Sequence, residues 1–312
     1  MDIKGSEQSR NKTTQGFHHS GTALNGSWPY LVDEETGKRM KLPREFYVRR
    51  AIKQEENSFF VKPDESNKQL IEYINQGFYF LLQGVCGSGK TTRCLYALNQ
   101  QLSDYCCLYI SLQAMEITDP KLFWFALAER LLIYNSNNIN IKKITLSITT
   151  AKEFLNLFRN EALFTKKKVV LFVDGFDLLL NETEYIRTEF IEVLSEIKQH
   201  RDIYCLHSFV GICRPVEISE SLFESVVAPT LTKEETENIF KEYCKEYSVQ
   251  LPEELIEDIF SCTGGHPGYT ALCGREIHET LLRGKNKLEM SEWMQFVKFL
   301  PDLIDSYFKD WM

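Results

Sequence analysis

Residues 78–92 read FYFLLQGVCGSGKTT, and this stretch decides the fold. Its first part, Phe78–Gln83, is apolar and aromatic, as in a short buried strand. Gly84–Thr91 matches the pattern GxxxxGK[ST] in full, and a helical pattern runs from Thr91 to Leu102. Strand, glycine-rich loop and helix in this order predict a phosphate-binding loop. The glycines let successive backbone N–H groups point at one anion, and the helix adds the positive end of its dipole.

Each residue type in this loop has a physical task. We expect Lys90 to reach the β- and γ-phosphates of a nucleotide and so to act in catalysis, and the hydroxyl of Thr91 to bind Mg²⁺. No base-reading motif typical of GTPases is present, which favours ATP as the ligand. The expected contacts to the nucleotide come from Gly84, Gly87, Ser88, Gly89, Lys90, Thr91 and Thr92.

A magnesium site of this kind needs a carboxylate at the end of a neighbouring strand. Asp174 ends the apolar run Val169–Asp174 and is the predicted second metal ligand. Asp177 lies three positions further on, where it could orient the attacking water or act as general base, or alternatively cap the next segment. Arg214 follows another strand, at the sheet edge where phosphates bind, and could sense the γ-phosphate or be a surface arginine.

Further strands and helices alternate along the chain. Apolar runs predict strands, and between them lie amphipathic or apolar helical patterns. Asp64 is the expected N-cap of a helix over Glu65–Asn75. The pattern predicts an α/β fold, a three-layer P-loop NTPase with a parallel five-stranded sheet. The other predicted strands are Cys106–Leu112, Lys168–Asp174, Ile203–Ile212 and Ser225–Pro229, and the helices are Pro120–Tyr134, Thr150–Leu163 and Glu184–His200.

The pattern changes after about residue 230, where only helices are predicted. We therefore expect a P-loop NTPase domain over residues 31–230 and a helical lid or C-terminal subdomain over residues 231–312, with a winged-helix-like arrangement left open. Residues 1–30 are polar and predict a disordered tail. The predicted C-terminal helices are Thr232–Tyr247, Pro252–Cys262, Pro267–Leu282 and Ser291–Met312.

Composition excludes several classes of protein. The chain has 312 residues, of which 43% are hydrophobic, so it can bury a substantial core and is not a disordered chain. Its net charge of −8 argues against a surface built as a whole to bind nucleic acid or anionic lipid. No apolar run is long enough to span a membrane, no secretory signal is visible, and the cysteines number nine without a CxxC pair. A cytoplasmic location is expected.

Two segments differ strongly in charge. Residues 38–53 contain seven basic residues and one acidic residue, whereas residues 217–258 contain twelve acidic residues and three lysines. We expect the two segments to face each other. A solvated basic face, a partner contact and a nucleic-acid contact are alternative interpretations of the first segment.

These motifs together resemble the AAA+ and STAND branch of P-loop NTPases. The sequence DGFD at Asp174–Asp177 is similar to the Asp-Gly-x-Asp motif of NACHT-type STAND proteins, and Arg214 lies where their post-sensor arginine lies. Gly265–Pro267 resembles the GxP turn of the family, whose proline packs on the adenine side of the nucleotide. The resemblance implies that Pro267 lines the nucleotide pocket.

A narrower resemblance rests on FYVR at Phe46–Arg49 and GGHPGYTALCGREI at Gly264–Ile277. Both stretches are similar to the AAA-ATPase-like domain of fungal and oomycete proteins, including the Crinkler group of effectors. That likeness implies a host cell or its nucleus as an alternative location. Two departures imply slow hydrolysis: Gly175 stands where AAA+ proteins carry a glutamate, and Leu178 stands where NACHT-type motifs carry one.

Four functions are compatible with the sequence. The first is a nucleotide-dependent switch with slow ATP hydrolysis, in which an unknown protein partner responds to the helical subdomain. The second is a hydrolysis-poor nucleotide-binding scaffold, and the third is a DNA-directed AAA+ ATPase. The fourth, a small-molecule kinase, needs a lid with several arginines, and only Arg214, Arg275 and Arg283 follow the last clear strand. A homo-oligomer stays open, because one sequence does not distinguish an arginine that acts on a neighbouring copy from a surface arginine.

Overall fold

The structure is a computed structural model. It describes residues 31–32, 39–40, 43–48, 51–52, 58–135, 148–159, 161–164, 166–181, 184–217 and 221–308. The chain divides into two units, residues 1–42 and residues 43–312. In the first unit, β1 (Leu31–Val32) and β2 (Arg39–Met40) pair antiparallel. The predicted tail, residues 1–30, lies outside the described residues.

A parallel five-stranded sheet forms the centre of the second unit, as predicted. Its order is β4-β5-β6-β3-β7, so the strand that precedes the phosphate-binding loop lies between β6 and β7. Ser111 at the end of β4 is in register with Asp174 at the end of β5, which brings the two strand ends together. The strands are β3 (Tyr79–Gln83), β4 (Cys106–Ser111), β5 (Val169–Asp174), β6 (Leu206–Cys213) and β7 (Glu224–Val227).

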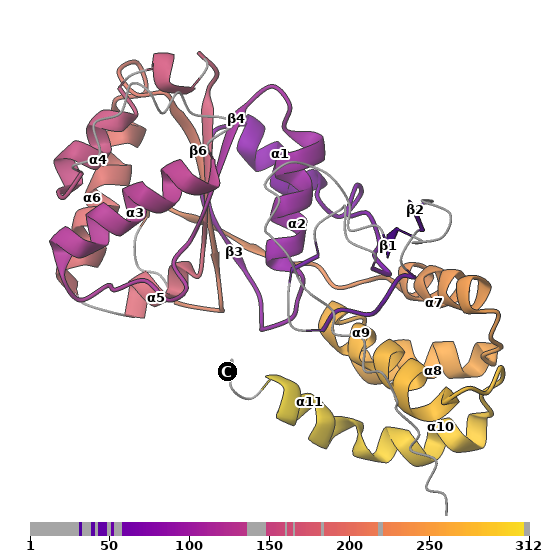
Figure 1. The fold of residues 1–312 in the computed structure, drawn as a ribbon. Coiled ribbons are helices and arrows are strands. Elements are labelled where there is room, and N and C mark those ends of the chain that lie inside the picture. Colours follow the sequence, from indigo (N-terminus) through magenta and orange to yellow (C-terminus); the bar gives the residue numbers. More distant parts are fainter. Residues whose placement is uncertain are drawn as a thin grey trace, which may run out of the picture. The chain divides into compact units, whose positions relative to one another are not determined.

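Helices cover both faces of this sheet and complete a three-layer arrangement (Figure 1). One face carries α1 (Lys68–Asn75) and α2 (Lys90–Tyr96), which continues as a π-helical turn, Ala97–Gln101. The other face carries α3 (Pro120–Tyr134), α4 (Ala151–Leu157) and α6 (Glu184–Gln199). The predicted helix Thr150–Leu163 is divided, because α4 ends at Leu157 and a separate 3-10 turn spans Glu161–Phe164. The short helix α5 (Phe176–Asn181) was not predicted.

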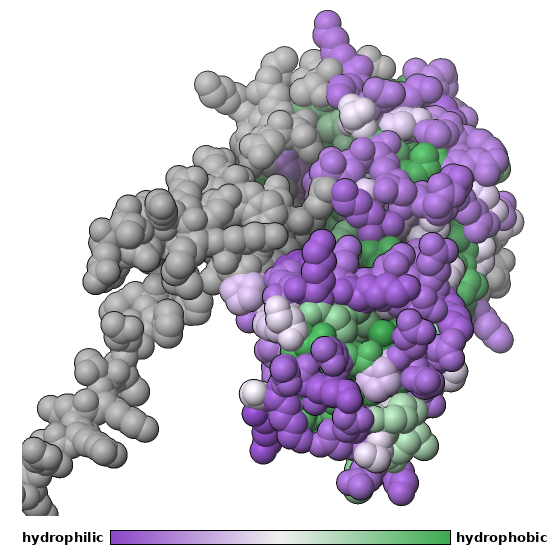
Figure 2. Space-filling view, turned by 90° about the vertical axis from the view of Figure 1, so that its right-hand side faces the viewer, coloured by the Kyte–Doolittle hydropathy of each residue, from purple (hydrophilic) through white to green (hydrophobic). Residues whose placement is uncertain are grey.

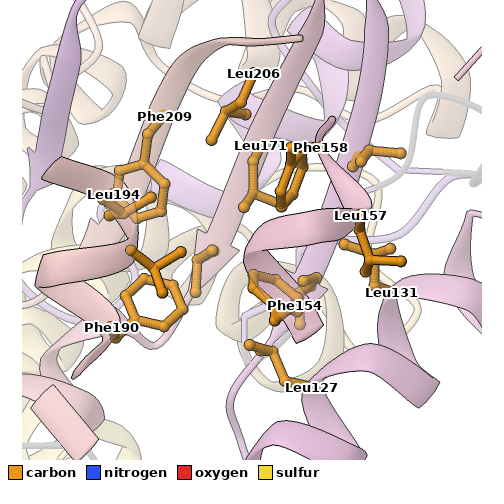
Figure 3. Close-up of a cluster of buried hydrophobic side chains, with 14 of the residues drawn as sticks. Leu127, Leu131, Phe154, Leu157, Phe158, Leu171, Phe190, Leu194, Leu206 and Phe209 are labelled. Atoms are coloured by element: carbon orange, nitrogen blue, oxygen red, sulfur yellow. The ribbon is translucent and has the colours of Figure 1, made fainter. Parts of the chain in front are cut away.

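The larger core of the sheet lies under α3, α4 and α6 (Figure 3). Aromatic and branched side chains from these helices meet those of β5 and β6, and each buried Leu or Phe stabilises the fold by about 1.5–3 kcal/mol relative to exposure. This core holds the carboxyl ends of β4, β5 and β6 in fixed positions. The labelled members are Leu127, Leu131, Phe154, Leu157, Phe158, Leu171, Phe190, Leu194, Leu206 and Phe209.

The C-terminal part is helical, as predicted. Thr232 caps α7 through a capping box with Glu235, and Pro267 begins α9. Among the described residues that follow β7, the β pairing consists of one isolated bridge, Gln250 with Lys287, so a winged hairpin is not formed there. The helices are α7 (Lys233–Tyr247), α8 (Glu253–Thr263), α9 (Pro267–Glu276) with the π-helical turn Ile277–Leu282, α10 (Met290–Phe296), the 3-10 turn Val297–Phe299 and α11 (Leu300–Phe308).

A segment far upstream in the sequence completes the core of this helical part. Phe46 and Phe59 are buried side by side, with ring centroids 4.7 Å apart. Between ring centroids, Phe46 lies 5.8 Å from Phe240 and 5.4 Å from Tyr243 of α7, and Phe59 lies 5.5 Å from Tyr243. Arg44 pairs with Glu242 and Glu246 at 2.5 and 2.6 Å, so the predicted encounter of the basic and acidic segments is confirmed for this residue. The face that carries α7 and α10 is mostly hydrophilic (Figure 2).

One predicted cap is wrong. Asn67, not Asp64, precedes α1, and its side chain donates instead to the carbonyl of Arg93 at 3.2 Å. Asp64 accepts a hydrogen bond from the hydroxyl of Tyr96 at 2.7 Å, because α2 packs beside the start of α1 and competes for the carboxylate. No helix in the described ranges combines the length and the apolar character needed to cross a membrane.

Candidate functional site

The glycine-rich loop runs from the end of β3 to the start of α2. Gly87 and Gly89 have φ angles of +74° and +80°, a left-handed backbone that glycine adopts without a steric cost. Lys90 Nζ donates to the carbonyls of Gly84 at 2.5 Å and Val85 at 2.8 Å and to Ser88 Oγ at 3.3 Å. Burial lowers the pKa of Lys90, against the opposing charges of Cys86 and Asp174. The cation therefore lies inside the loop.

Three side chains meet at the carboxyl end of β5. Thr91 Oγ1 donates to Asp174 Oδ2 at 3.0 Å, and the hydroxyl of Tyr109, on β4, donates to the same oxygen at 2.8 Å. Burial raises the pKa of Asp174, while these two hydrogen bonds and one from the backbone of Gly175 act in the opposite direction. Tyr109 was not predicted, because it lies inside a strand far from both motifs in the sequence.

The pair formed by Thr91 and Asp174 fits the chemistry of magnesium. Both offer hard oxygen atoms, and Mg²⁺ bound with a nucleotide usually takes only one or two protein oxygens beside phosphates and water. Within the described residues no group of three or more His, Cys, Asp or Glu side chains could hold a metal. The site thus suits a metal that arrives with a polyphosphate.

Asp177, which is buried, and Arg214, which is partly exposed, form an ion pair beside this cluster. Arg214 Nε donates to Asp177 Oδ2 at 2.7 Å, and the backbone N–H of Arg214 donates to Oδ1 at 3.2 Å. The side chain of Asp177 is 7% exposed and that of Arg214 is 40% exposed. Both oxygens of Asp177 are therefore occupied in this conformation, and its role as base and that of Arg214 as sensor stay predictions.

The turn before α9 lies directly on the glycine-rich loop. Gly268 N donates to the carbonyl of Gly87 at 3.0 Å, and a Cβ placed on Gly89 would lie 3.6 Å from Pro267 Cγ. His266 is the N-cap of α9, since its Nδ1 accepts from the backbone N–H of Tyr269 at 3.2 Å. Burial lowers the pKa of His266 to about 4. This neutral, capping histidine has a structural role.

These elements surround one cavity of about 770 Å³, a size typical of small-molecule sites. Gly87–Thr92, Asp174, Asp177 and Arg214 line one side, and Pro267 lines the other. Gly84 begins the loop and accepts from Lys90 through its carbonyl, and Thr92 Oγ1 accepts from the backbone N–H of Ile52 at 3.1 Å. The structure thus gathers the predicted site residues at one place. Lining residues that the sequence did not single out include Phe60, Pro63, Tyr109, Gln113, Tyr307 and Phe308.

Comparison with known proteins identifies the fold. No protein-family model matches the chain, and curated proteins give no significant match. The structure is similar to the Walker-type ATPase PABY2304 of Pyrococcus abyssi, with 14% identity, a TM-score of 0.55, and coverage of 85% of this chain and 78% of that one. It is also similar to the ORC2 protein of Aeropyrum pernix, with 14% identity, a TM-score of 0.51, and coverage of 81% and 69%. The chain therefore has the fold of P-loop ATPases.

Proposed function

We propose that the protein is an ATP-binding P-loop NTPase of the AAA+ and STAND type, which acts as a nucleotide-dependent switch with slow hydrolysis. One observation carries this proposal. A complete phosphate-binding loop and the hydrogen-bonded pair of Thr91 and Asp174 line the same side of a cavity whose other side is the helical part. A nucleotide in that cavity would contact both parts at once, so its loss or hydrolysis would free one from the other.

The proposed roles follow the position of each residue. Gly84, Gly87, Ser88, Gly89, Lys90, Thr91 and Thr92 would bind the phosphates or hold the loop that binds them. Thr91 and Asp174 would hold Mg²⁺, which supplies positive charge to the transferring phosphoryl group. Pro267 would pack against the adenine. For Lys90 to reach the phosphates, it must exchange its bonds to the carbonyls of Gly84 and Val85 for bonds to phosphate oxygens.

The domain division and the partner belong to the same proposal. The sheet over residues 31–230 would hold the nucleotide, and the helical part over residues 231–312 would report its state to a partner protein or to a second copy of the chain. The FYVR and GGHPGYTALCGREI stretches support a Crinkler-type module. The neighbour ORC2 was solved with ADPNP and ADP, which makes adenine nucleotides the first ligands to test.

The experiment is magnesium-dependent ATP turnover by the purified chain, with nucleotide binding recorded on the same samples. Lys90→Ala should abolish turnover, because removing the cation leaves the transferring phosphate uncompensated. Lys121→Ala, an exposed lysine at the start of α3, is the matched control and should behave as the wild type. A chain that binds no adenine nucleotide, or turnover that survives in Lys90→Ala, would refute the proposal.

A second candidate function has its own support. Gly175 carries no side chain where a glutamate would stand, and both oxygens of Asp177 are held by Arg214. These features favour a nucleotide-binding scaffold that hydrolyses ATP poorly. Tight binding of ATP without turnover in the same experiment would select it over the switch.

A further inference from the structure

The turn that follows β4 borders the cavity beside the proposed metal site. Because Ser111 is in register with Asp174, the residues after Ser111 lie next to those after Asp174. Leu112 N donates to the carbonyl of Asp174 at 2.8 Å, which extends this pairing past the strand end. A Cβ placed on Gly175 would lie 3.8 Å from Gln113 Cγ. Gln113 therefore lies beside position 175, as does Leu178, whose Cδ1 would be 3.3 Å from the same Cβ.

This turn is held in a fixed shape. Arg130, from α3, donates to the carbonyls of Ser111 at 2.5 Å, Gln113 at 2.7 Å and Ala114 at 3.2 Å. Ala114 has a φ of +55°, a left-handed conformation that is uncommon for residues with a side chain and is found preferentially at functional sites. One guanidinium thus fixes a strained turn whose exposed side chain is Gln113.

The other polar groups at this end of the cavity are already engaged. Asp177 is held by Arg214, and the hydroxyl of Tyr109 donates to Asp174. In the portion of the chain that the structure describes, by contrast, the side-chain amide of Gln113 has no hydrogen-bond partner, although it lines the cavity. A carboxamide offers an acceptor oxygen and a donor N–H₂ group, and its oxygen can accept a hydrogen bond from a water molecule beside a phosphate.

We infer that Gln113 is a catalytic residue of ATP hydrolysis, which holds the attacking water in line with the γ-phosphate. The inference rests on the proposed function. The amide oxygen of Gln113 accepts a hydrogen bond from the water, whose oxygen forms the new bond to the γ-phosphorus. The bond from that phosphorus to the bridging oxygen breaks with its electron pair on ADP, and the water protons end on inorganic phosphate and solvent. Gln113 gains and loses no proton.

The test compares steady-state ATP turnover and the affinity for a fluorescent ATP analogue in three variants. Gln113→Ala should lower kcat about a hundredfold, the usual contribution of a group that prepares the nucleophile, with nucleotide affinity within twofold of the wild type. Gln113→Glu keeps an acceptor oxygen at the same reach and should restore kcat to within tenfold. Gln199→Ala, at an exposed glutamine on α6 whose side-chain amide donates to Ser195, is the matched control.

The outcomes separate this inference from the proposed function. If Gln113→Ala keeps kcat within threefold while Lys90→Ala is inactive, the ATPase stands and the role of Gln113 is refuted. If Gln113→Ala loses nucleotide affinity in proportion to turnover, Gln113 contributes to binding instead. If the wild type binds ATP and shows no turnover that depends on Lys90, both the catalytic role and the hydrolysis are refuted, and only nucleotide binding remains.

Discussion

The two sides of the cavity are built differently. The phosphate wall consists of Gly84–Thr92 and Asp174, and its geometry is held by hydrogen bonds such as that from Thr91 to Asp174. The helical wall includes Pro267 and also Val48 and Phe308, which come from distant segments and share one apolar cluster. Hydrogen bonds to phosphate demand fixed atoms and so fixed residues, whereas apolar packing demands only shape and volume. The sequence therefore identifies the first wall by its motif, whereas for the second wall it indicates only Pro267, through the resemblance to a GxP turn.

The largest effect should come from the phosphate wall. Asp174→Asn keeps the shape of the side chain and removes its charge, so we expect magnesium-dependent turnover to fall by a factor of about 10²–10³. Nucleotide affinity measured without magnesium should fall much less than turnover does. Phosphate release across a magnesium titration measures it. Asp119→Asn, which conserves the N-cap of α3 outside the cavity, should leave turnover unchanged. Equal losses in both variants would contradict the assignment of Asp174.

On the helical wall, Phe308→Ala should destabilise the fold by about 3 kcal/mol. Phe308 is 3% exposed and packs on Tyr269, with ring centroids 5.2 Å apart, and against Gly87 of the phosphate wall. Urea unfolding measures the change in the free energy of unfolding. Phe299→Ala, at a side chain that is 62% exposed just before α11, should change it by less than about 0.5 kcal/mol. A similar cost for both would mean that α11 does not pack on the loop in solution.

The stability of the turn before α9, which joins the two walls, should depend more on Gly265 than on Gly264. Gly264 and Gly265 have φ angles of +58° and +70°, but only a Cβ on Gly265 would strike a backbone atom, the carbonyl oxygen of Leu231. We expect Gly265→Ala to lower the free energy of unfolding by about 3 kcal/mol and Gly264→Ala by about 1 kcal/mol. Thermal unfolding of the two variants side by side tests the difference, and equal costs would count against the close contact with Leu231.

Acid should weaken the contact between the walls through His266. Burial and the charge of Lys90 depress its pKa from 6.5 to about 4, while the backbone at Cys86 opposes them. As the pH falls, the imidazole therefore binds a proton in the unfolded chain before it does so in the folded chain. The stability that the neutral His266 contributes is complete above pH 6.5 and is lost as the pH falls toward 4. At pH 5 the loss in the free energy of unfolding should be about 2 kcal/mol. His266→Asn keeps an N-cap acceptor without titrating. Its free energy of unfolding should fall less than that of the wild type between about pH 7 and pH 5, as urea titrations at each pH would show.

The smallest effect concerns Tyr109. Tyr109→Phe removes the hydrogen bond to Asp174 Oδ2, which should raise the pKa of that carboxyl further and weaken magnesium binding by about 1 kcal/mol, roughly fivefold in the magnesium concentration at half-maximal turnover. Tyr105→Phe removes a comparable hydroxyl, bonded to Asn75, outside the cavity. If both variants require the same magnesium as the wild type, Tyr109 has no part in positioning Asp174.

The elements of the sheet were largely predictable. Pro120–Tyr134 has the predicted bounds, because Asp119 supplies the N-cap and Pro120 the first helical position. Strand positions agreed within a few residues, since buried parallel strands are continuous apolar runs. The predicted N-cap of α1 was wrong because the hydroxyl of Tyr96 donates to Asp64 instead. Tyr96 belongs to α2, a helix that comes near Asp64 only in the folded chain. Local signals therefore succeed where no distant residue competes.

The sequence by itself determined the phosphate-binding loop, the parallel sheet and the place of Asp174, because these depend on residue types at short, fixed spacings. Only the tertiary structure decided that Arg214 pairs with Asp177 and that the hydroxyl of Tyr109 donates to Asp174. The same holds for the position of Gln113 in the lining of the cavity. The physical reason is the parallel sheet. It aligns the carboxyl ends of strands that are separated by whole helices, so the partners of each polar side chain are set by strand order and register, which no local pattern records.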